Sequence, residues 1–258
     1  MKPKLIVLVV VLLVVAMIPA LASAKSQAKP QKMVRVTVDI TKPLGPQLDA
    51  QLGVTSRGPR AINAPGVARP RAGSNSIQPN AVYALLNTSF EAPNWPSTIG
   101  NADGFAFLEA GLSPVGWDAT DYRDKRGNQS LYSAGWLNDP YVNPFYDDDM
   151  ESYAFYPADL TGARRVQARF QYRSDTEFGY DYFLWCSSTD GTFFNCDGHT
   201  GSTNGTWRLV TLDSKTSPIM ADMLDEPGAM FGFIFVSDFI FTDEGTYIDP
   251  MRVRAWGP

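Results

Sequence analysis

From about residue 83 to the end of the chain, apolar and polar residues alternate with the two-residue period of β-strands. The run RRVQARFQYRS is the clearest, and it places Val166, Ala168, Phe170 and Tyr172 on one face. The runs DYFLWCSS, TWRLVTLD, AMFGFIFVSD and GTYIDPMRVRAW follow, each bounded by Gly, Asp, Asn, Ser or Pro. Short strands between turn residues, with no helical period among them, predict an all-β fold, either a two-sheet antiparallel β-sandwich or a barrel.

The pattern before residue 81 is different. The run VRVTVDI alternates as a strand would, but SRGPRAINAPGVARPRAGSNSIQPN is rich in Pro, Gly, Ser and Arg. Such a composition buries too little apolar surface to offset the entropy lost on ordering. We therefore predict that residues 25–80 are a basic linker or pro-segment and that residues 81–258 form one sandwich domain.

The first 24 residues have the three regions of a secretory signal peptide. A short basic stretch begins at Met1, and an apolar run broken by Pro19 follows it. Ala22, Ser23 and Ala24 then fit the small-x-small cleavage rule, which places the cut before Lys25. An uncleaved membrane anchor is the alternative, because the apolar run is nearly long enough to span a bilayer. Either way we expect the rest of the chain outside the cell, secreted if the segment is removed and with no membrane span after cleavage.

If the chain is exported, its two cysteines, Cys186 and Cys196, are expected to be oxidised. An oxidising compartment favours a disulfide, and the intervening TDGT is a strong hairpin signal. A turn centred on Asp190–Thr192 sets the cysteines opposite each other, where Cβ atoms lie about 4.5–5.5 Å apart. The single histidine, His199, falls in a polar stretch that we expect to be a loop. A zinc site built on Cys or His ligands is therefore excluded.

Charge divides the chain into a basic front and an acidic body. Residues 25–80 contain nine Lys or Arg and two Asp or Glu, a balance of +7. Residues 81–258 contain eleven Lys or Arg and twenty-five Asp or Glu, a balance of −14. An acidic folded domain does not suit nucleic acid partners. It does suit an extracellular module that holds cations.

The order of several sequence pieces is informative. NTSFE opens the domain, EFGYDYF and STDG follow, and SDFIFTDEGTYID precedes the final strand. Between roughly Leu85 and Val253 this order resembles the jelly-roll domain of the MAM-like type found beside the protease domain of immune-inhibitor-A metallopeptidases. The resemblance implies a two-sheet antiparallel sandwich, often with bound calcium, that supports or targets a catalytic partner. One departure is Pro250, which stands where a second acid usually follows Y-I-D.

Four carboxylates are candidate calcium ligands. The first and last strands of a jelly roll usually lie side by side, which would bring Glu91 near Asp249, and the TEFGYD bend would add Glu177 and Asp181. Calcium takes about six to eight oxygen ligands, and carboxylates are prominent among them. Solvated surface acids are the alternative. A glycosidase pair made of Glu177 and Asp181 would be about 13 Å apart on an extended strand, unless Gly179 bends the chain, whereas hydrolysis needs about 5–9.5 Å.

The expected function is binding rather than catalysis. We predict a secreted, non-enzymatic, calcium-stabilised module that takes part in extracellular binding or adhesion, or that assists a secreted enzyme. Its ligand would be an extracellular protein or a glycan. A carbohydrate-binding module or a weak glycoside hydrolase is the alternative, because aromatic residues in the loops are numerous enough to build a sugar-stacking platform: Tyr122, Trp136, Tyr141, Phe145 and Tyr146.

Overall fold

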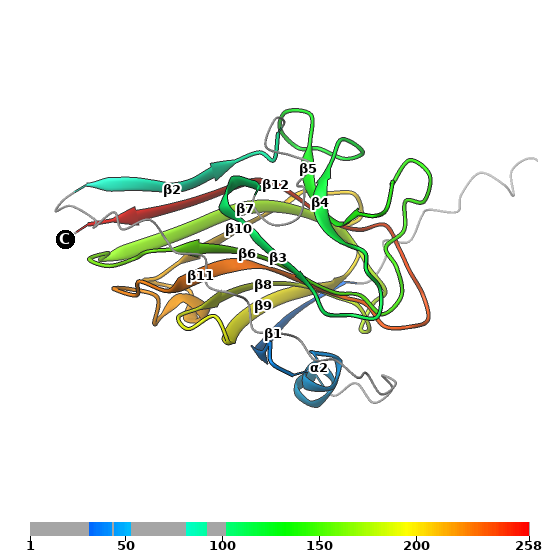
Figure 1. Ribbon diagram of the computed structural model, residues 1–258, viewed down its shortest axis with the longest axis horizontal. Helices are drawn as coiled ribbons and strands as arrows, with labels where there is room; N and C mark the ends of the chain where they lie inside the picture. The colour runs from blue at the N-terminus through cyan, green and yellow to red at the C-terminus, as the bar shows by residue number, and fades with distance from the viewer. Residues whose placement is uncertain (1–30, 43, 53–80, 92–101, 258) are drawn as a thin grey trace, which may run out of the picture.

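Two antiparallel β-sheets face each other in this computed structural model, which describes residues 31–42, 44–52, 81–91 and 102–257 (Figure 1). In spatial order, the strands of sheet A are β1 (Gln31–Asp39), β9 (Phe193–Gly201), β8 (Tyr182–Ser188), β11 (Ala229–Val236), β6 (Glu151–Ala158) and β3 (Ala106–Glu109). Those of sheet B are β10 (Arg208–Asp213), β7 (Arg165–Asp175), β12 (Gly245–Trp256), β5 (Ser130–Trp136) and β4 (Gly116–Thr120), and β2 (Val82–Thr88) also pairs with β12. The predicted all-β sandwich is confirmed.

Eight of these strands have the order of a jelly roll. Sheet B contains the run β5-β12-β7-β10, and sheet A contains β6-β11-β8-β9. Along the chain the strands alternate between the two sheets, except at the hairpin of β8 and β9. This is the interleaving of two Greek keys that defines a jelly roll. It also makes β12 a central strand, flanked by β7 on one side and by β5 and β2 on the other.

The core between the sheets is largely aromatic. Val166, Ala168, Phe170 and Tyr172 of β7 are all buried, as their alternation predicts. The Phe170 ring lies 5.0 Å from that of Phe233 in a T-shaped contact. Such contacts add specific geometry to the burial of large apolar surfaces.

Sheet A also has an apolar outer face, and this changes the predicted domain boundary. Strand β1 pairs with β9 along its whole length, and Val34, Val36 and Val38 are buried. Residues 31–52, which the sequence analysis assigned to a linker, therefore belong to the sandwich. The prediction rested on the average composition of residues 25–80, which outweighed the short alternating run at its start. That run forms a strand because it pairs with β9, a strand that is distant in the sequence. The other residues of 25–80 and the predicted signal peptide lie outside the described residues.

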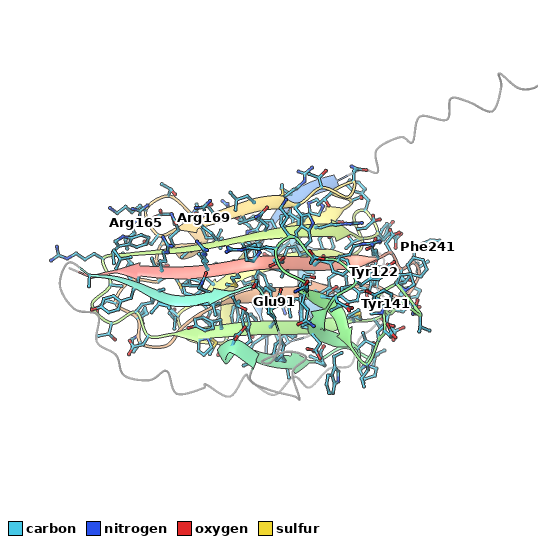
Figure 2. All side chains as sticks on the ribbon, turned by 90° about the horizontal axis from the view of Figure 1, so that it is seen from above. Glu91, Tyr122, Tyr141, Arg165, Arg169 and Phe241 are labelled. Carbon is cyan, nitrogen blue, oxygen red and sulfur yellow. A yellow bond between two sulfur atoms is a disulfide. The ribbon has the colours of Figure 1, made fainter. Side chains whose placement is uncertain are left out.

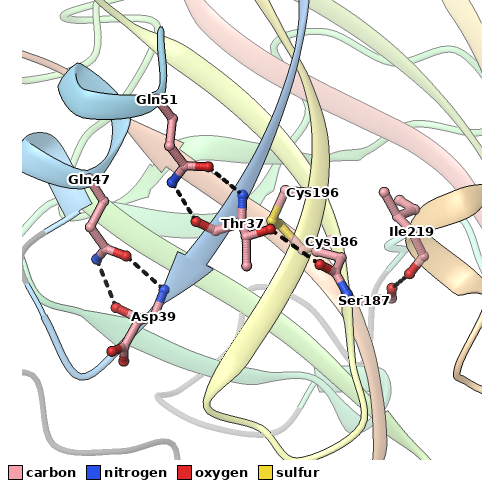
Figure 3. The surroundings of a disulfide bond; sticks show 9 residues. Thr37, Asp39, Gln47, Gln51, Cys186, Ser187, Cys196 and Ile219 are labelled. Carbon is pink, nitrogen blue, oxygen red and sulfur yellow. Dashed lines mark hydrogen bonds between the residues drawn. A yellow bond between two sulfur atoms is a disulfide. The ribbon is translucent and has the colours of Figure 1, made fainter.

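Helix α2 (Leu44–Leu52) closes the edge of sheet A (Figure 3). The side-chain amide of Gln47 accepts a hydrogen bond from Asp39 N and donates one to Asp39 O, both at 2.8 Å. Gln51 makes the same pair of bonds with Thr37, at 2.9 Å to N and 2.6 Å to O. The two glutamines thus act as a substitute for a further strand on a sheet edge that would otherwise invite pairing with another chain.

The predicted disulfide is present. Cys186 and Cys196 are directly opposite in the β8–β9 hairpin and are bonded, with an S–S distance of 2.00 Å (Figure 3). The Asp190 carboxylate accepts hydrogen bonds from the N–H groups of Thr192 and Phe193 at 2.8 and 2.9 Å, which fixes the turn. Gly191 in this turn has φ of +71°, a conformation that favours glycine.

Besides α2, the described chain has two short 3-10 turns, η2 (Ala102–Gly104) and η3 (Pro218–Met220). Within the described ranges, no helix has both the length and the apolar character needed to cross a bilayer.

Candidate functional site

Three loops meet at one end of the sandwich, the end toward the right of Figure 1: residues 137–150, 176–181 and 237–244. Hydrogen bonds join them to one another. Tyr146 N donates to Asp243 O at 3.1 Å, and Asp149 N donates to Asp238 O at 2.7 Å. The Tyr146 hydroxyl donates to Asp181 across the loops. The loops therefore form one connected surface rather than three independent tips.

A buried acidic cluster lies beneath this surface. Glu177, Asp181 and Asp238 each offer a carboxylate oxygen, and these oxygens lie within 4.8 Å of one another. Asp181 and Asp238 are 0% and 1% exposed. Asp238 Oδ1 accepts from Ile240 N at 3.0 Å, whereas its buried Oδ2 has no hydrogen-bond partner in the described part of the chain. The cluster could hold a metal ion, because hard carboxylate oxygens and an orphaned buried acceptor fit a cation.

Two hydrogen-bond donors face the cluster, the hydroxyl of Tyr146 and the N–H of Asp238. Burial, followed by the charge of Asp181, raises the pKa of Tyr146 far above its ordinary value, so the hydroxyl stays protonated and remains a donor. The N–H of Asp238 donates to Asp181 Oδ1 at 2.7 Å. Carboxylates this close repel one another when ionised. A bound cation would remove that repulsion.

The structure divides the four predicted calcium ligands between two places. Glu177 and Asp181 lie in the acidic cluster with Asp238. Glu91 and Asp249 instead hold the loop between β4 and β5: Asp249 Oδ2 accepts from Lys125 N and Arg126 N at 2.8 and 2.5 Å. Glu91 Oε1 accepts from the N–H groups of residues 128 and 129.

Glu91 and Asp249 are nevertheless neighbours, as expected from adjacent first and last strands. Burial raises the pKa of Asp249 to about 6, the two backbone N–H donors oppose that shift, and the charge of Glu91 adds to it. Asp238 was missed in the sequence analysis. The sequence does contain an indication: Asp238 directly follows the apolar run AMFGFIFVS, which predicts that it lies at the end of a buried strand. In the structure this end of β11 lies beside the start of β8, which Asp181 precedes.

The predicted aromatic residues are only partly at the surface. Tyr141 and Phe145 are 65% and 47% exposed, and Tyr122 and Trp136 are half-buried. Tyr146 is 1% exposed and belongs to the core, so it is not part of a surface platform. Its ring packs against Phe235 and its hydroxyl donates a hydrogen bond to Asp181, so both the apolar and the polar part of this loop tyrosine have buried partners.

Other exposed apolar residues at this end were not predicted. Phe178, Phe239, Ile240 and Phe241 are between 42% and 65% exposed. The signal in the sequence is FIF flanked by acids, three apolar residues that the strand alternation does not explain. Together with the exposed Tyr141 and Phe145 and the half-buried Tyr122, they form what we call the aromatic end: Tyr122, Tyr141, Phe145, Phe178, Phe239, Ile240 and Phe241. Figure 2 shows Tyr122, Tyr141 and Phe241 at this end of the molecule.

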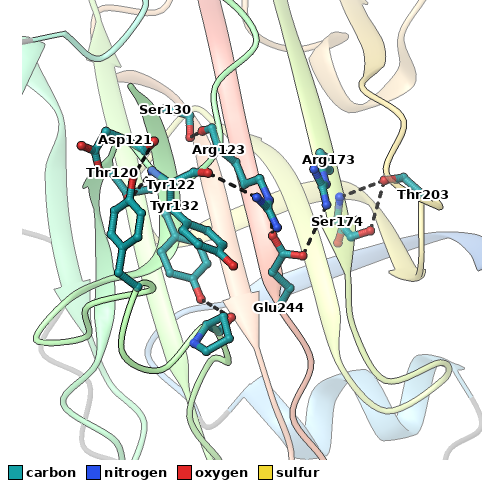
Figure 4. A network of polar contacts seen from close by, with 12 residues as sticks. Thr120, Asp121, Tyr122, Arg123, Ser130, Tyr132, Arg173, Ser174, Thr203 and Glu244 are labelled. Carbon is teal, nitrogen blue, oxygen red and sulfur yellow. Dashed lines mark hydrogen bonds and ion pairs between the residues drawn. The ribbon is translucent and has the colours of Figure 1, made fainter. Parts of the chain in front are cut away.

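A polar network fixes the Tyr122 side of the aromatic end (Figure 4). Glu244 accepts hydrogen bonds from Arg123 at 2.7 Å and from Arg173 at 3.3 Å. The Arg123 guanidinium lies 4.2 Å from the centre of the Tyr122 ring. Tyr122 and Tyr141 meet edge to face, with ring centres 5.1 Å apart. Rings held this way lose little freedom when a ligand binds.

The burial of Asp181 argues against the hypothesis that Glu177 and Asp181 are the catalytic pair of a glycoside hydrolase. The two residues are closer than the extended-strand estimate, because the chain turns at Gly179, which has φ of +86°, and Asp181 N donates to Glu177 O at 3.1 Å. Asp181 is wholly buried, however. Hydrolysis needs both carboxylates within contact distance of the substrate, and in this arrangement Asp181 is covered by its neighbours.

No protein-family model and no curated protein sequence matches the chain. Among solved structures, the xylan-binding CBM22-1 domain of Xyn10C from Paenibacillus barcinonensis has 13% identity and a TM-score of 0.43, and covers 70% of this chain and 99% of that domain. A cleaved adhesin domain of Lys-gingipain from Porphyromonas gingivalis has 13% identity and a TM-score of 0.46, and covers 66% and 99%. The functional argument therefore rests on this chain's own residues.

Proposed function

We propose that this protein is a secreted, non-catalytic β-sandwich module that binds an extracellular ligand through its aromatic end. The observation that carries the proposal is the gathering of exposed large apolar side chains on three connected loops, with the half-buried Tyr122 of the β4–β5 loop packed against Tyr141. Single exposed apolar residues are ordinary, but a contiguous patch rimmed by polar groups marks an interaction site. The disulfide is in keeping with an oxidising, extracellular setting. An accessory role of the MAM-like type beside a secreted enzyme is part of this proposal.

Calcium would stabilise the loops that carry the aromatic end. Glu177, Asp181 and Asp238 come from two of the three loops, so one cation bound among them would fix both loops together. The ion would supply positive charge to a buried acidic cluster, and the protein oxygens would leave room for water ligands. Binding of the ligand should then depend on calcium, even though the ion itself does not touch the ligand.

Carbohydrate binding is the second candidate, and the Tyr122–Tyr141 pair favours it. Both rings are fixed, and acids such as Asp121 and Asp139 lie on the same surface and can accept hydrogen bonds from sugar hydroxyls. The Phe239–Phe241 tip favours a protein ligand instead, because three adjacent apolar residues match an apolar protein surface better than a sugar.

The experiment is a binding screen of the mature protein against a glycan array and against extracellular matrix proteins, in calcium and in EDTA. For any ligand found, Tyr141→Ala and the double variant Phe239→Ser with Phe241→Ser should weaken binding by about tenfold or more. Phe193→Ser is the matched control, because Phe193 is 55% exposed in the hairpin at the opposite end of the sandwich. If the control weakens binding and the other variants do not, the aromatic end is not the ligand surface.

A further inference from the structure

The outer face of sheet B contains a cleft in which four of the eight lining residues are cationic. Its volume is about 390 Å³, within the range of small-molecule sites. The loop between β4 and β5 forms one wall, and strands β7, β10 and β12 form the floor. Figure 2 looks onto this side of the molecule and labels Arg169. Its lining includes Lys125, Arg126, Arg169, Gln171, Leu209 and Arg252. We call it the basic cleft.

Strand register sets its arginines opposite one another. Arg169 of β7 pairs in register with Arg252 of β12. Arg254 lies two residues further along β12, on the same face, and lines an adjoining hollow together with both of them. Like charges directly opposite each other destabilise a sheet. This arrangement costs stability, so folding alone does not account for it.

Within the described residues, the arginines of the cleft take part in no ion pair. In the described part of the chain, neither Arg169 nor Arg254 has an ion-pair partner, and Arg252 donates to the neutral Asn87 side chain at 2.6 Å. Asp213, on the neighbouring strand β10, pairs with Arg165.

The cleft contrasts with the rest of the domain. Residues 81–258 have a balance of −14, yet this surface is cationic. Asp249 is buried behind it and accepts the backbone N–H groups of Lys125 and Arg126, which fixes the loop that carries these two side chains. The chain's own segment 53–80 is a poor occupant, because its charged residues are all arginines: Arg57, Arg60, Arg69 and Arg71.

We infer that the basic cleft binds a linear acidic polysaccharide through its carboxylate or sulfate groups. The guanidinium fork of arginine matches both anions with paired hydrogen bonds. Gln171 offers an amide for sugar hydroxyls, and Leu209, which is 56% exposed, offers an apolar contact for a sugar face. Nucleic acid fits less well, because Phe170, the one aromatic in the lining, is buried and cannot stack on a base. The acidic body would also repel a dense polyphosphate.

The test uses the mature full chain and three polymers: neutral dextran, dextran sulfate and polygalacturonate. Titration calorimetry at low salt should detect binding to at least one acidic polymer and none to dextran. The two acidic polymers distinguish sulfate from carboxylate as the recognised group. Affinity should fall as sodium chloride is raised, because the contacts are between exposed charges. The cleft is separate from the aromatic end, so this inference stands or falls independently of the proposed function.

Substitutions inside and outside the basic cleft test whether the polysaccharide binds there. Arg169→Gln with Arg252→Gln should weaken binding by about tenfold or more. Lys32→Gln with Lys215→Gln removes the same charge from other exposed positions and should change affinity by less than about twofold. Arg169→Lys with Arg252→Lys keeps the charge but loses the fork, so its affinity should lie between the two. It also tests the cleft if the glutamine variant does not fold.

Three results would overturn the inference. The first is the absence of binding to both acidic polymers at low salt. The second is equal affinity of the arginine-to-glutamine and lysine-to-glutamine variants. The third is tighter binding to single-stranded DNA than to either acidic polymer, which would assign the cleft to another class of ligand.

Discussion

His199 illustrates what a single side chain does in this fold. The sequence placed it in a polar loop, but it lies in strand β9, 1% exposed, with its ring 5.5 Å from that of Tyr172. Its Nδ1 is 3.4 Å from the Tyr172 hydroxyl. Burial, followed by the charge of Arg208, lowers the pKa of His199 from 6.5 to about 4.

Taken alone, this shift makes the folded chain less stable in mild acid, whereas the raised pKa of Asp249 acts in the opposite direction over the same pH range. The unfolded chain binds a proton at His199 below about pH 6.5, whereas the folded chain does so only below about pH 4. The stabilising contribution is complete above pH 6.5 and is lost as the pH falls toward 4, by about 3 kcal/mol. Because His199 is the only histidine, one NMR titration can check the pKa without assignment. A midpoint near 6.5 would contradict the prediction. Between pH 6.5 and 4, the free energy of unfolding of His199→Gln should fall less than that of the wild type, by the contribution of His199.

At the scale of elements, the disulfide stabilises the β8–β9 hairpin, and the side chains of Gln47 and Gln51 satisfy the backbone groups at the β1 edge. The disulfide closes a loop whose cysteines are ten positions apart. Cross-linking a loop of this length should stabilise the domain by about 2–3 kcal/mol, mainly by restricting the unfolded chain.

For the hairpin, we expect reductant to lower the free energy of unfolding of the wild type by that amount. The double variant Cys186→Ala with Cys196→Ala should lose at least as much and should not respond to reductant. Chemical denaturation followed by tryptophan fluorescence measures both. Two alkylatable thiols in protein purified without reductant would show that the bridge does not form.

For the β1 edge, Gln47→Ala with Gln51→Ala should expose the backbone groups of Thr37 and Asp39. The variant removes four hydrogen bonds to these groups, each worth about 0.5–1.5 kcal/mol net, so we expect the free energy of unfolding to fall by about 2–6 kcal/mol. We also expect concentration-dependent self-association, because a bare edge can pair with another chain. Hydrogen exchange and size-exclusion chromatography measure these effects. Lys32→Ala, an exposed change on the same strand, is the control, and equal behaviour of the two proteins would disprove the role of the glutamines.

At the scale of the whole molecule, the acidic cluster joins two loops that are remote along the chain, residues 176–181 and 237–244. If it binds calcium only when folded, a hundredfold excess over Kd stabilises by about 2.7 kcal/mol. For a domain of this size that corresponds to a rise in Tm of about 5–11 °C.

Melts in EDTA and in millimolar calcium test this prediction. Asp238→Asn should abolish the calcium-dependent rise, because it removes a carboxylate from the cluster. Asp249→Asn should keep the rise, because Asp249 holds the β4–β5 loop and lies outside the cluster. The reverse outcome would place the cation at Glu91 and Asp249, and identical melts of the wild type in both conditions would end the calcium proposal.

Local order along the chain was enough to predict much of this fold. Val166, Ala168, Phe170 and Tyr172 identify a half-buried strand, because neighbouring side chains point to opposite faces. The Asp-Gly turn predicts that Cys186 faces Cys196, because a hairpin's register follows from its turn. In both cases the residues that matter lie within about ten positions of one another. The β1 segment was missed because its partner, β9, is more than 150 residues away.

The site was decided by tertiary structure. Asp181 and Asp238 are 57 positions apart and meet only because β8 and β11 are neighbours in sheet A, whereas Asp249 lies in sheet B. Arg169 and Arg252 face each other for the same kind of reason. The sequence by itself determined the strands, the hairpin, the disulfide and the acidic character of the domain. Which acids form a cluster and which cations line a cleft depends on strand order and register, because these decide the neighbours of residues that are remote along the chain.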